Sequence, residues 1–216
     1  MPDAYVFPGG TVTEADLSER AFARTVGIDE PRLREQFRAR TAPEMNVPLP
    51  SPREAAGLLI AALRELYEEA GVLLATQPVK AIPSSRTPFL ELLEQTNLWG
   101  DAQRLVFFSQ WLTPPQFAQR YNTHFFLARA NPDETATADT LETHDGLWMT
   151  PGDALDRFAG GGLALVYPTI KHLERLTAFG TIEELFAFAR SKPILAITPN
   201  TTDTGFALPA ELEGAW

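Results

Sequence analysis

The spacing of apolar residues is clearest in the segment that follows Ser51. Ser51, Pro52 and Glu54 form a helix start signal, with an N-cap, a proline at the first helical position and the acid of a capping box. The pattern predicts a helix from Pro52 to about Ala70, ended by Gly71, which can adopt the left-handed conformation. Its apolar stripe consists of Leu59, Ala62, Leu63, Leu66 and Ala70.

Dense apolar runs predict two long strands, Arg104–Trp111 and Asn122–Ala130, on either side of a Thr-Pro-Pro turn. Shorter strands are expected at Ala4–Phe7, Val72–Leu74 and Gly146–Met149. Further helices are expected at Leu17–Thr25, Pro31–Arg40, Phe89–Leu98, Pro151–Phe158, Pro168–Phe179 and Ile182–Arg190. Strands and helices interleave without an internal repeat, so we expect one α+β domain over residues 1–198 and an irregular tail over 199–216.

Composition narrows the function classes. With no cysteine among 216 residues, a disulfide scaffold, an iron–sulfur cluster and a cysteine nucleophile are excluded. The net charge of −10 argues against nucleic acid and anionic membrane as partners. No signal peptide or membrane-spanning run is evident, so a cytoplasmic protein is the expectation. A phosphate substrate would need a metal ion to supply positive charge.

Candidate chemistry concentrates in the string Arg-Glu-Leu-Tyr-Glu-Glu-Ala-Gly-Val at 64–72. On a helix, Glu69 lies about 40° from Glu65, and Glu68 about 60° to the other side, so three carboxylates share one face. Such a face suits Mg²⁺ or Mn²⁺, which prefer oxygen ligands. Arg64 precedes Glu68 by four residues and can orient it. The plain alternative is a solvated acidic face, but chance produces this string on the order of 10⁻⁵ times in a chain of this length.

The string resembles the signature of the Nudix hydrolases: Gly, five residues, Glu, seven residues, then Arg-Glu-U-x-Glu-Glu-x-Gly-U, with U a bulky aliphatic residue. Residues 64–72 match the second half, and Phe7-Pro8-Gly9-Gly10 resembles the entry to the first. Counted from Gly10, the acidic position falls on Asp16, 48 residues before Arg64 instead of 8. A Nudix subgroup that includes a peroxisomal coenzyme A diphosphatase also splits the signature by a long insertion.

Later segments extend the resemblance over about residues 4–178. They are Gln110–Pro114, Arg120–Phe126, and Trp148–Pro151 with the following Ala154-Leu155. The resemblance implies an α/β/α sandwich with a mixed β-sheet and a helical insertion, residues 17–53, between the Gly-Gly loop and the metal-binding helix. Nudix domains place one or two strands before the Phe-Pro-Gly-Gly segment; these are expected to be missing here, and an uncovered sheet edge can pair with a second copy in a homodimer.

The resemblance also implies a reaction, hydrolysis of a nucleoside diphosphate linked to a group X with Mg²⁺ or Mn²⁺. Glu65 and Glu69 are then the expected metal ligands, Glu68 a third, with Arg64 beside them and the backbone of Gly9 and Gly10 near the metals. Glu142, or Asp145, is a candidate for a further acid outside the helix. Coenzyme A or acyl-coenzyme A is the leading small-molecule substrate, with dinucleotides, ADP-ribose and nucleotide sugars open. The competing hypothesis is a non-catalytic nucleotide-binding or regulatory Nudix-fold protein.

Overall fold

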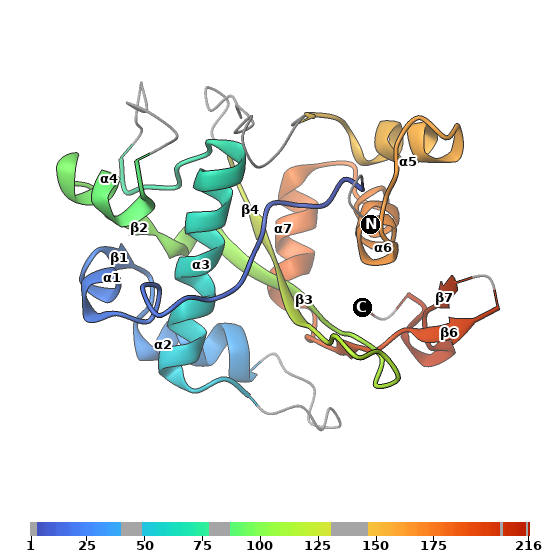
Figure 1. Cartoon of the computed structure of the whole chain (residues 1–216), viewed down its shortest axis with the longest axis horizontal. Coiled ribbons are helices and arrows are strands. Elements are labelled where there is room, and N and C mark those ends of the chain that lie inside the picture. The colour runs from blue at the N-terminus through green and yellow to red at the C-terminus, as the bar shows by residue number, and fades with distance from the viewer. Residues whose placement is uncertain (1–3, 40–48, 78–86, 131–146, 204, 215) are drawn as a thin grey trace.

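The computed structural model describes residues 4–39, 49–77, 87–130, 147–203, 205–214 and 216 (Figure 1). Its central sheet has the order β4-β3-β5. Strand β3 (Leu105–Leu112) pairs antiparallel with β4 (Asn122–Ala128) and parallel with β5 (Ala196–Ile197). The sheet is therefore mixed, as expected from the family resemblance.

Helices cover both faces of this sheet (Figure 1). Alternate residues of β3 divide between two cores, since side chains of a strand point to opposite faces. Leu105 and Phe107 belong to the core built on the long helix α3 (Pro52–Ala70), while Val106 and Phe108 belong to the core built on α7 (Ile182–Ser191). This layering is the expected α/β/α sandwich.

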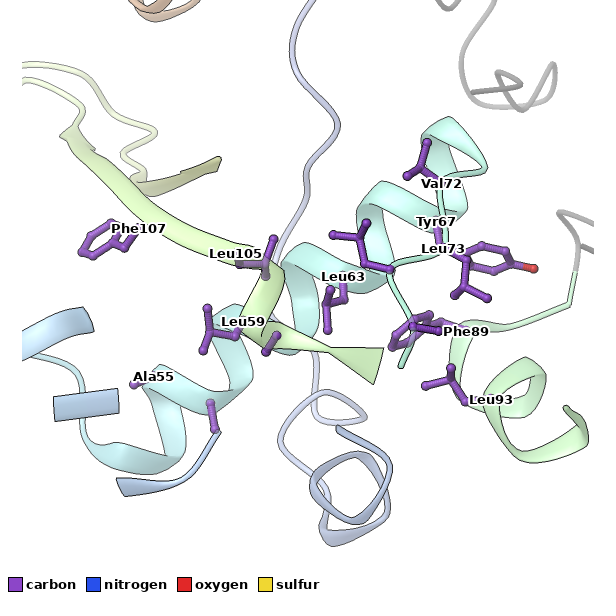
Figure 2. Close-up of a cluster of buried hydrophobic side chains, with 14 of the residues drawn as sticks. Ala55, Leu59, Leu63, Tyr67, Val72, Leu73, Phe89, Leu93, Leu105 and Phe107 are labelled. Carbon is purple, nitrogen blue, oxygen red and sulfur yellow. The ribbon is translucent and has the colours of Figure 1, made fainter. Parts of the chain in front are cut away.

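The helix α3 forms as its sequence predicts. Ser51 accepts a hydrogen bond from the Glu54 backbone N–H, and the Glu54 carboxylate accepts one from the Ser51 N–H at 2.8 Å, which completes the capping box. Gly71 ends the helix at a φ of 67°. Figure 2 shows Ala55, Leu59, Leu63 and Tyr67 along the buried side of α3.

The remaining helices lie close to their expected positions. They are α1 (Glu19–Ala23), α2 (Glu30–Leu33) with a π-helical continuation (Arg34–Ala39), α4 (Phe89–Gln95), α5 (Pro151–Ala159) and α6 (Tyr167–Leu176). Two 3₁₀ turns, Ala102–Arg104 and Ala210–Leu212, were not predicted. The first helix is shorter than predicted because Thr25 enters strand β1 (Thr25–Val26), which pairs with β2 (Gly100–Asp101). Within the described ranges, no helix has both the length and the apolar character needed to cross a bilayer.

Three short strand predictions are wrong. Residues 4–7 make a single bridge, between Tyr5 and Leu165. Val72–Leu74 is buried but joins the segment around Gly100 through isolated hydrogen bonds, such as Asp101 N–H to the Leu74 carbonyl at 2.9 Å. Residues 147–149 form no strand, and Gly146 lies outside the described residues. In each case the sequence signalled apolar character, which is not specific to strands: Val72–Leu74 is a buried coil, whereas Val6 and Trp148 are 61% and 66% exposed.

The C-terminal tail, expected to be irregular, contains an antiparallel hairpin of β6 (Asn200–Thr202) and β7 (Gly205–Ala207). The final Trp216 is 4% exposed and packs into the α7 core. The short strand β5 before the hairpin was missed altogether. These strands are only two or three residues long, which is too short to leave a periodic pattern in the sequence.

Candidate active site

The N-terminal segment crosses α3 and places its glycine turn against the C-terminal half of that helix (Figure 1). The Gly9 backbone N–H donates a hydrogen bond to Oε2 of Glu69 at 2.8 Å. Gly10 lies so close to Glu65 that a Cβ at this position would be 2.2 Å from Oε1 of the carboxylate. Both predicted site glycines therefore lie against predicted site carboxylates, Gly9 against Glu69 and Gly10 against Glu65.

Arg64 is the centre of the site. Its guanidinium donates to both oxygens of Asp16, at 2.9 and 3.0 Å, to Oε1 of Glu65 at 2.8 Å, and to Oε2 of Glu68 at 3.0 Å. A further bond reaches the Thr11 carbonyl at 3.0 Å. Burial alone would lower the pKa of Arg64, but the hydrogen bonds that it donates to Asp16 and Glu68 outweigh burial and raise the pKa above its usual value. Arg64 is thus a fixed cation among four acidic or carbonyl partners.

Asp16 occupies the acidic position of the split signature in space as well as in sequence. Its side chain is only 2% exposed, and its Oδ2 also accepts from the backbone N–H and the hydroxyl of Thr13 at 2.8 and 2.9 Å. A buried carboxylate with this many donors is fully satisfied. The role of Thr13 was not foreseen, although Thr-x-x-Asp is a local spacing at which a hydroxyl and a carboxylate commonly meet.

The three glutamates lie on one helix face, but they are held apart by their partners. Arg64 forms ion pairs with Glu65 and Glu68, whereas Glu69 accepts a hydrogen bond from the Gly9 backbone N–H. Among the described residues, no three His, Asp or Glu side chains gather closely enough to hold a metal ion by themselves. The three-ligand metal set from the sequence therefore stays a prediction.

The donor set nevertheless fits a hard divalent cation. Arg64 occupies one oxygen of Glu65 and one of Glu68, and a carboxylate has a second oxygen available for coordination. The side chains of these two residues are 13% and 33% exposed. The missing side chain at Gly10 leaves room for the Glu65 carboxylate, which any larger residue would displace.

Other candidates have weaker positions. Glu142 and Asp145 lie outside the described residues, so their proposed roles stay predictions. Tyr121 is 54% exposed at the β3–β4 turn. His124 packs between Phe37 and Phe107, and burial lowers its pKa to about 4, so it is neutral near neutral pH. His124 therefore contributes to aromatic packing and carries no positive charge that could bind substrate phosphate near neutral pH.

Comparison with known proteins decides the family. The model of the NUDT19 Nudix domain matches residues 1–176, well over half of the chain. The chain belongs to the NUDT19 Nudix family. Its Gly9–Gly10 turn, Asp16 and the Arg64–Val72 string are therefore parts of a Nudix signature interrupted by the segment 17–53, as their contacts indicate.

The relatives of this NUDT19-type chain include proteins named acyl-coenzyme A diphosphatase NUDT19. The Gallus gallus protein is 30% identical over 236 residues, which cover 90% of this chain and 62% of the relative. The Homo sapiens protein is 27% identical over 235 residues, covering 90% and 61%. The chain thus spans about three fifths of the length of these relatives.

A solved structure supports the fold assignment. The crystal structure of a NUDIX hydrolase from Alicyclobacillus acidocaldarius matches with a TM-score of 0.62 and 26% identity, over 84% of this chain and 79% of that one. The layered arrangement of the NUDT19-type chain is therefore a Nudix fold.

Proposed function

We propose that this chain is a divalent-metal-dependent diphosphatase that cleaves the diphosphate bond of coenzyme A or acyl-coenzyme A. The observation that carries the proposal is the reassembly of the split signature, in which Asp16 and Arg64 fix α3 to the Gly9–Gly10 turn. Relatives named acyl-coenzyme A diphosphatase support the substrate class. Hydrolysis at this bond adds water across the P–O–P linkage and leaves adenosine bisphosphate and an acylated or free phosphopantetheine.

The proposed ligands of the cation are Glu65 and Glu69, with Glu68 as a third and Mg²⁺ or Mn²⁺ as the ion. When bound, such an ion neutralises the diphosphate and lowers the pKa of the attacking water. Nudix hydrolases generally use divalent metals, and clustered carboxylates have no evident role in a protein that only binds nucleotides.

The residues around the carboxylates have separate tasks in this proposal. Arg64 fixes the side chains of Glu65 and Glu68, because each accepts a charge-assisted hydrogen bond from it. Gly10 lets the backbone lie directly against the Glu65 carboxylate, in a position from which any larger side chain would displace it. Proton transfer from water falls to one of the glutamates or to Glu142.

Hydrolysis of coenzyme A, octanoyl-coenzyme A, NADH, ADP-ribose and nucleotide sugars with Mg²⁺ or Mn²⁺ tests the proposal. We expect coenzyme A compounds to be cleaved, and chelation by EDTA to abolish turnover. Glu65→Gln and Glu69→Gln each remove a charged ligand and should lower kcat by about 10²–10³-fold, the range for lost transition-state electrostatics. Glu91→Gln, on the exposed surface of α4, is the matched control and should retain activity.

Turnover that survives EDTA, or that is unchanged in Glu69→Gln, would contradict the metal-dependent reaction. Folded, metal-saturated protein that binds a nucleotide but cleaves none of the panel would favour the non-catalytic binding protein.

A further inference from the structure

A cavity of about 230 Å³ lies between the inserted segment and the first turn of α3. Its walls are mainly apolar and are formed by Leu33, Phe37, Leu49, Pro50, Pro52 and Ala55. The charged residues at the cavity, Glu30 and Arg34, neutralise each other in an ion pair at 2.9 Å. Ser51 completes the lining, so the cavity offers a wall of mostly apolar residues without an uncompensated charge.

This cavity and the proposed catalytic carboxylates belong to the same helix. Ala55 lies 14 residues before Glu69, which corresponds to about 21 Å along the helix axis and about 40° around it. Glu65 lies about 15 Å along the axis from Ala55. Figure 2 shows Ala55 at the opposite end of α3 from Tyr67 and Val72. The cavity therefore lies at a fixed distance from the proposed catalytic carboxylates, on a neighbouring side of the same helix, α3.

The helix surface between them is apolar and only half-buried. Leu58, Ala62 and Leu66 follow Ala55 at helical spacing, and each is partly exposed although it packs on the α3 core. Phe126 of β4 packs on the same core in the same half-buried state, and its ring lies 6.2 Å from that of Phe37 in the cavity wall. Apolar residues therefore connect the cavity to the carboxylates.

We propose that this cavity binds the apolar acyl group of an acyl-coenzyme A, with the pantetheine arm lying along the α3 surface. The inference rests on the proposed function and adds the part of the substrate that the insertion recognises. About thirteen bonds separate the diphosphate from the thioester sulfur, which span about 15 Å at the rise per bond of an extended chain. That reach matches the distance from Glu65 to the cavity.

The size of the cavity limits the acyl chain. At roughly 30 Å³ for each water-sized group, 230 Å³ holds about seven or eight carbons. Each buried methylene is worth about a fourfold change in affinity. We therefore expect KM to fall as the chain lengthens to about eight carbons and to level off or rise beyond that length.

The test compares coenzyme A with butanoyl-, octanoyl- and palmitoyl-coenzyme A, using the native chain and Leu49→Trp. Leu49 is 42% exposed at the cavity, so a larger aromatic residue can block the space with little cost to the core. The native chain should show a KM for octanoyl-coenzyme A at least tenfold below that for coenzyme A. Leu49→Trp should raise the octanoyl KM at least fivefold and change the coenzyme A KM less than twofold.

Ile182→Trp is the matched control, since Ile182 is 52% exposed on α7, in the other helical layer. It should leave both KM values unchanged. Calorimetric binding of octanoyl-pantetheine, which has no diphosphate, gives a second readout that does not depend on catalysis; the native chain should bind it and Leu49→Trp should bind it at least fivefold more weakly.

The outcomes separate the two proposals. Hydrolysis of all coenzyme A compounds with equal KM, or a Leu49→Trp effect that is the same for coenzyme A and octanoyl-coenzyme A, overturns the acyl site and leaves the diphosphatase intact. Absence of hydrolysis together with cavity-dependent binding of octanoyl-pantetheine overturns the diphosphatase and supports the acyl site. Absence of both overturns both.

Discussion

Asp16 and Arg64, which are 48 positions apart, form a two-point ion pair with N–O distances of 2.9 and 3.0 Å. The pair closes the inserted segment into a loop and brings the two halves of the signature together. Their side chains are 2% and 14% exposed, so the charges are removed from water and depend on each other. The insertion thus lengthens the chain between the two residues without separating them.

Asp16→Ala should lower the free energy of unfolding by about 1.5–3 kcal/mol, because it removes both hydrogen bonds to Asp16 from the partly buried guanidinium of Arg64, which keeps Glu65 and Glu68 as partners. Urea denaturation measures this loss. The control is Glu19→Ala, which removes an ion pair with Arg53 whose side chains are 58% and 85% exposed, and should cost under about 1 kcal/mol. Equal effects of the two substitutions would show that burial of the Asp16–Arg64 pair has no energetic importance.

Gly10→Ala should lower kcat by about 10²-fold with little change in fold stability. The added methyl would lie 2.2 Å from Oε1 of Glu65, so the carboxylate has to move away from its position beside Arg64. A misplaced catalytic group costs about this factor. The measurement is steady-state hydrolysis of coenzyme A at saturating metal.

Gly9→Ala is the control for that substitution. A Cβ at Gly9 would meet only the Phe7 carbonyl at 3.9 Å, an ordinary contact, and the backbone N–H that bonds to Glu69 is retained. We expect activity within about threefold of that of the native chain. This corresponds to a change in activation free energy well below the roughly 1.4 kcal/mol of a tenfold rate change. A stronger defect in Gly9→Ala than in Gly10→Ala would contradict the role assigned to the Glu65 contact.

Local signals explain what the sequence could predict. The start and the end of α3 depend on residues within one or two turns of each other, and the helix forms at the predicted bounds. Of the predicted apolar stripe, Leu59 and Leu63 are buried, whereas Ala62, Leu66 and Ala70 are only partly buried. The position of Asp16 followed from a fixed spacing after Gly10, and its contact with Arg64 agrees with that assignment. Mixed pairing in the sheet followed from the family resemblance.

Non-local pairing explains what the sequence could not predict. Strand β5 is two residues long, and it is a strand only because β3 lies beside it. Val72–Leu74 has the composition of a strand, but among the residues that the structure describes no neighbouring strand runs alongside it for a full ladder. The cavity at Leu49 also arises where the insertion folds back on α3, a contact that no local pattern marks.

Stability should fall as the pH is lowered from about 6.5 toward about 4, because two histidines are held neutral in the fold. Burial, and secondarily the charge of Lys192, lower the pKa of His172 to about 4, and burial lowers that of His124 to about 4. The folded-state pKa values of the two histidines are below the unfolded value of about 6.5. Between these pH values, His124 and His172 therefore take up protons mainly in the unfolded chain, which stabilises the unfolded state. Each histidine should cost about 2 kcal/mol between about pH 7 and about pH 5.

Urea denaturation at the two pH values measures the loss. In His172→Gln the pH-dependent part should fall by about half, even though the substitution also disturbs the contact between His172 Nε2 and the Ser109 hydroxyl at 2.6 Å. A pH dependence in His172→Gln equal to that of the native chain would show that His172 is not responsible.

Trp216 anchors the C-terminal segment in the α7 core. Its ring lies 5.2 Å from His172 and 5.5 Å from Trp111, both edge-on, and only 4% of the residue is exposed. Trp216→Ala should therefore cost about 3–5 kcal/mol, as for other buried tryptophans, and lower the thermal midpoint. Trp148→Ala is the matched control: Trp148 is 66% exposed, so its removal should change stability by less than about 0.5 kcal/mol. If both substitutions leave the midpoint unchanged, the tail does not stabilise the fold, and β6 and β7 would have to be held by their own pairing alone.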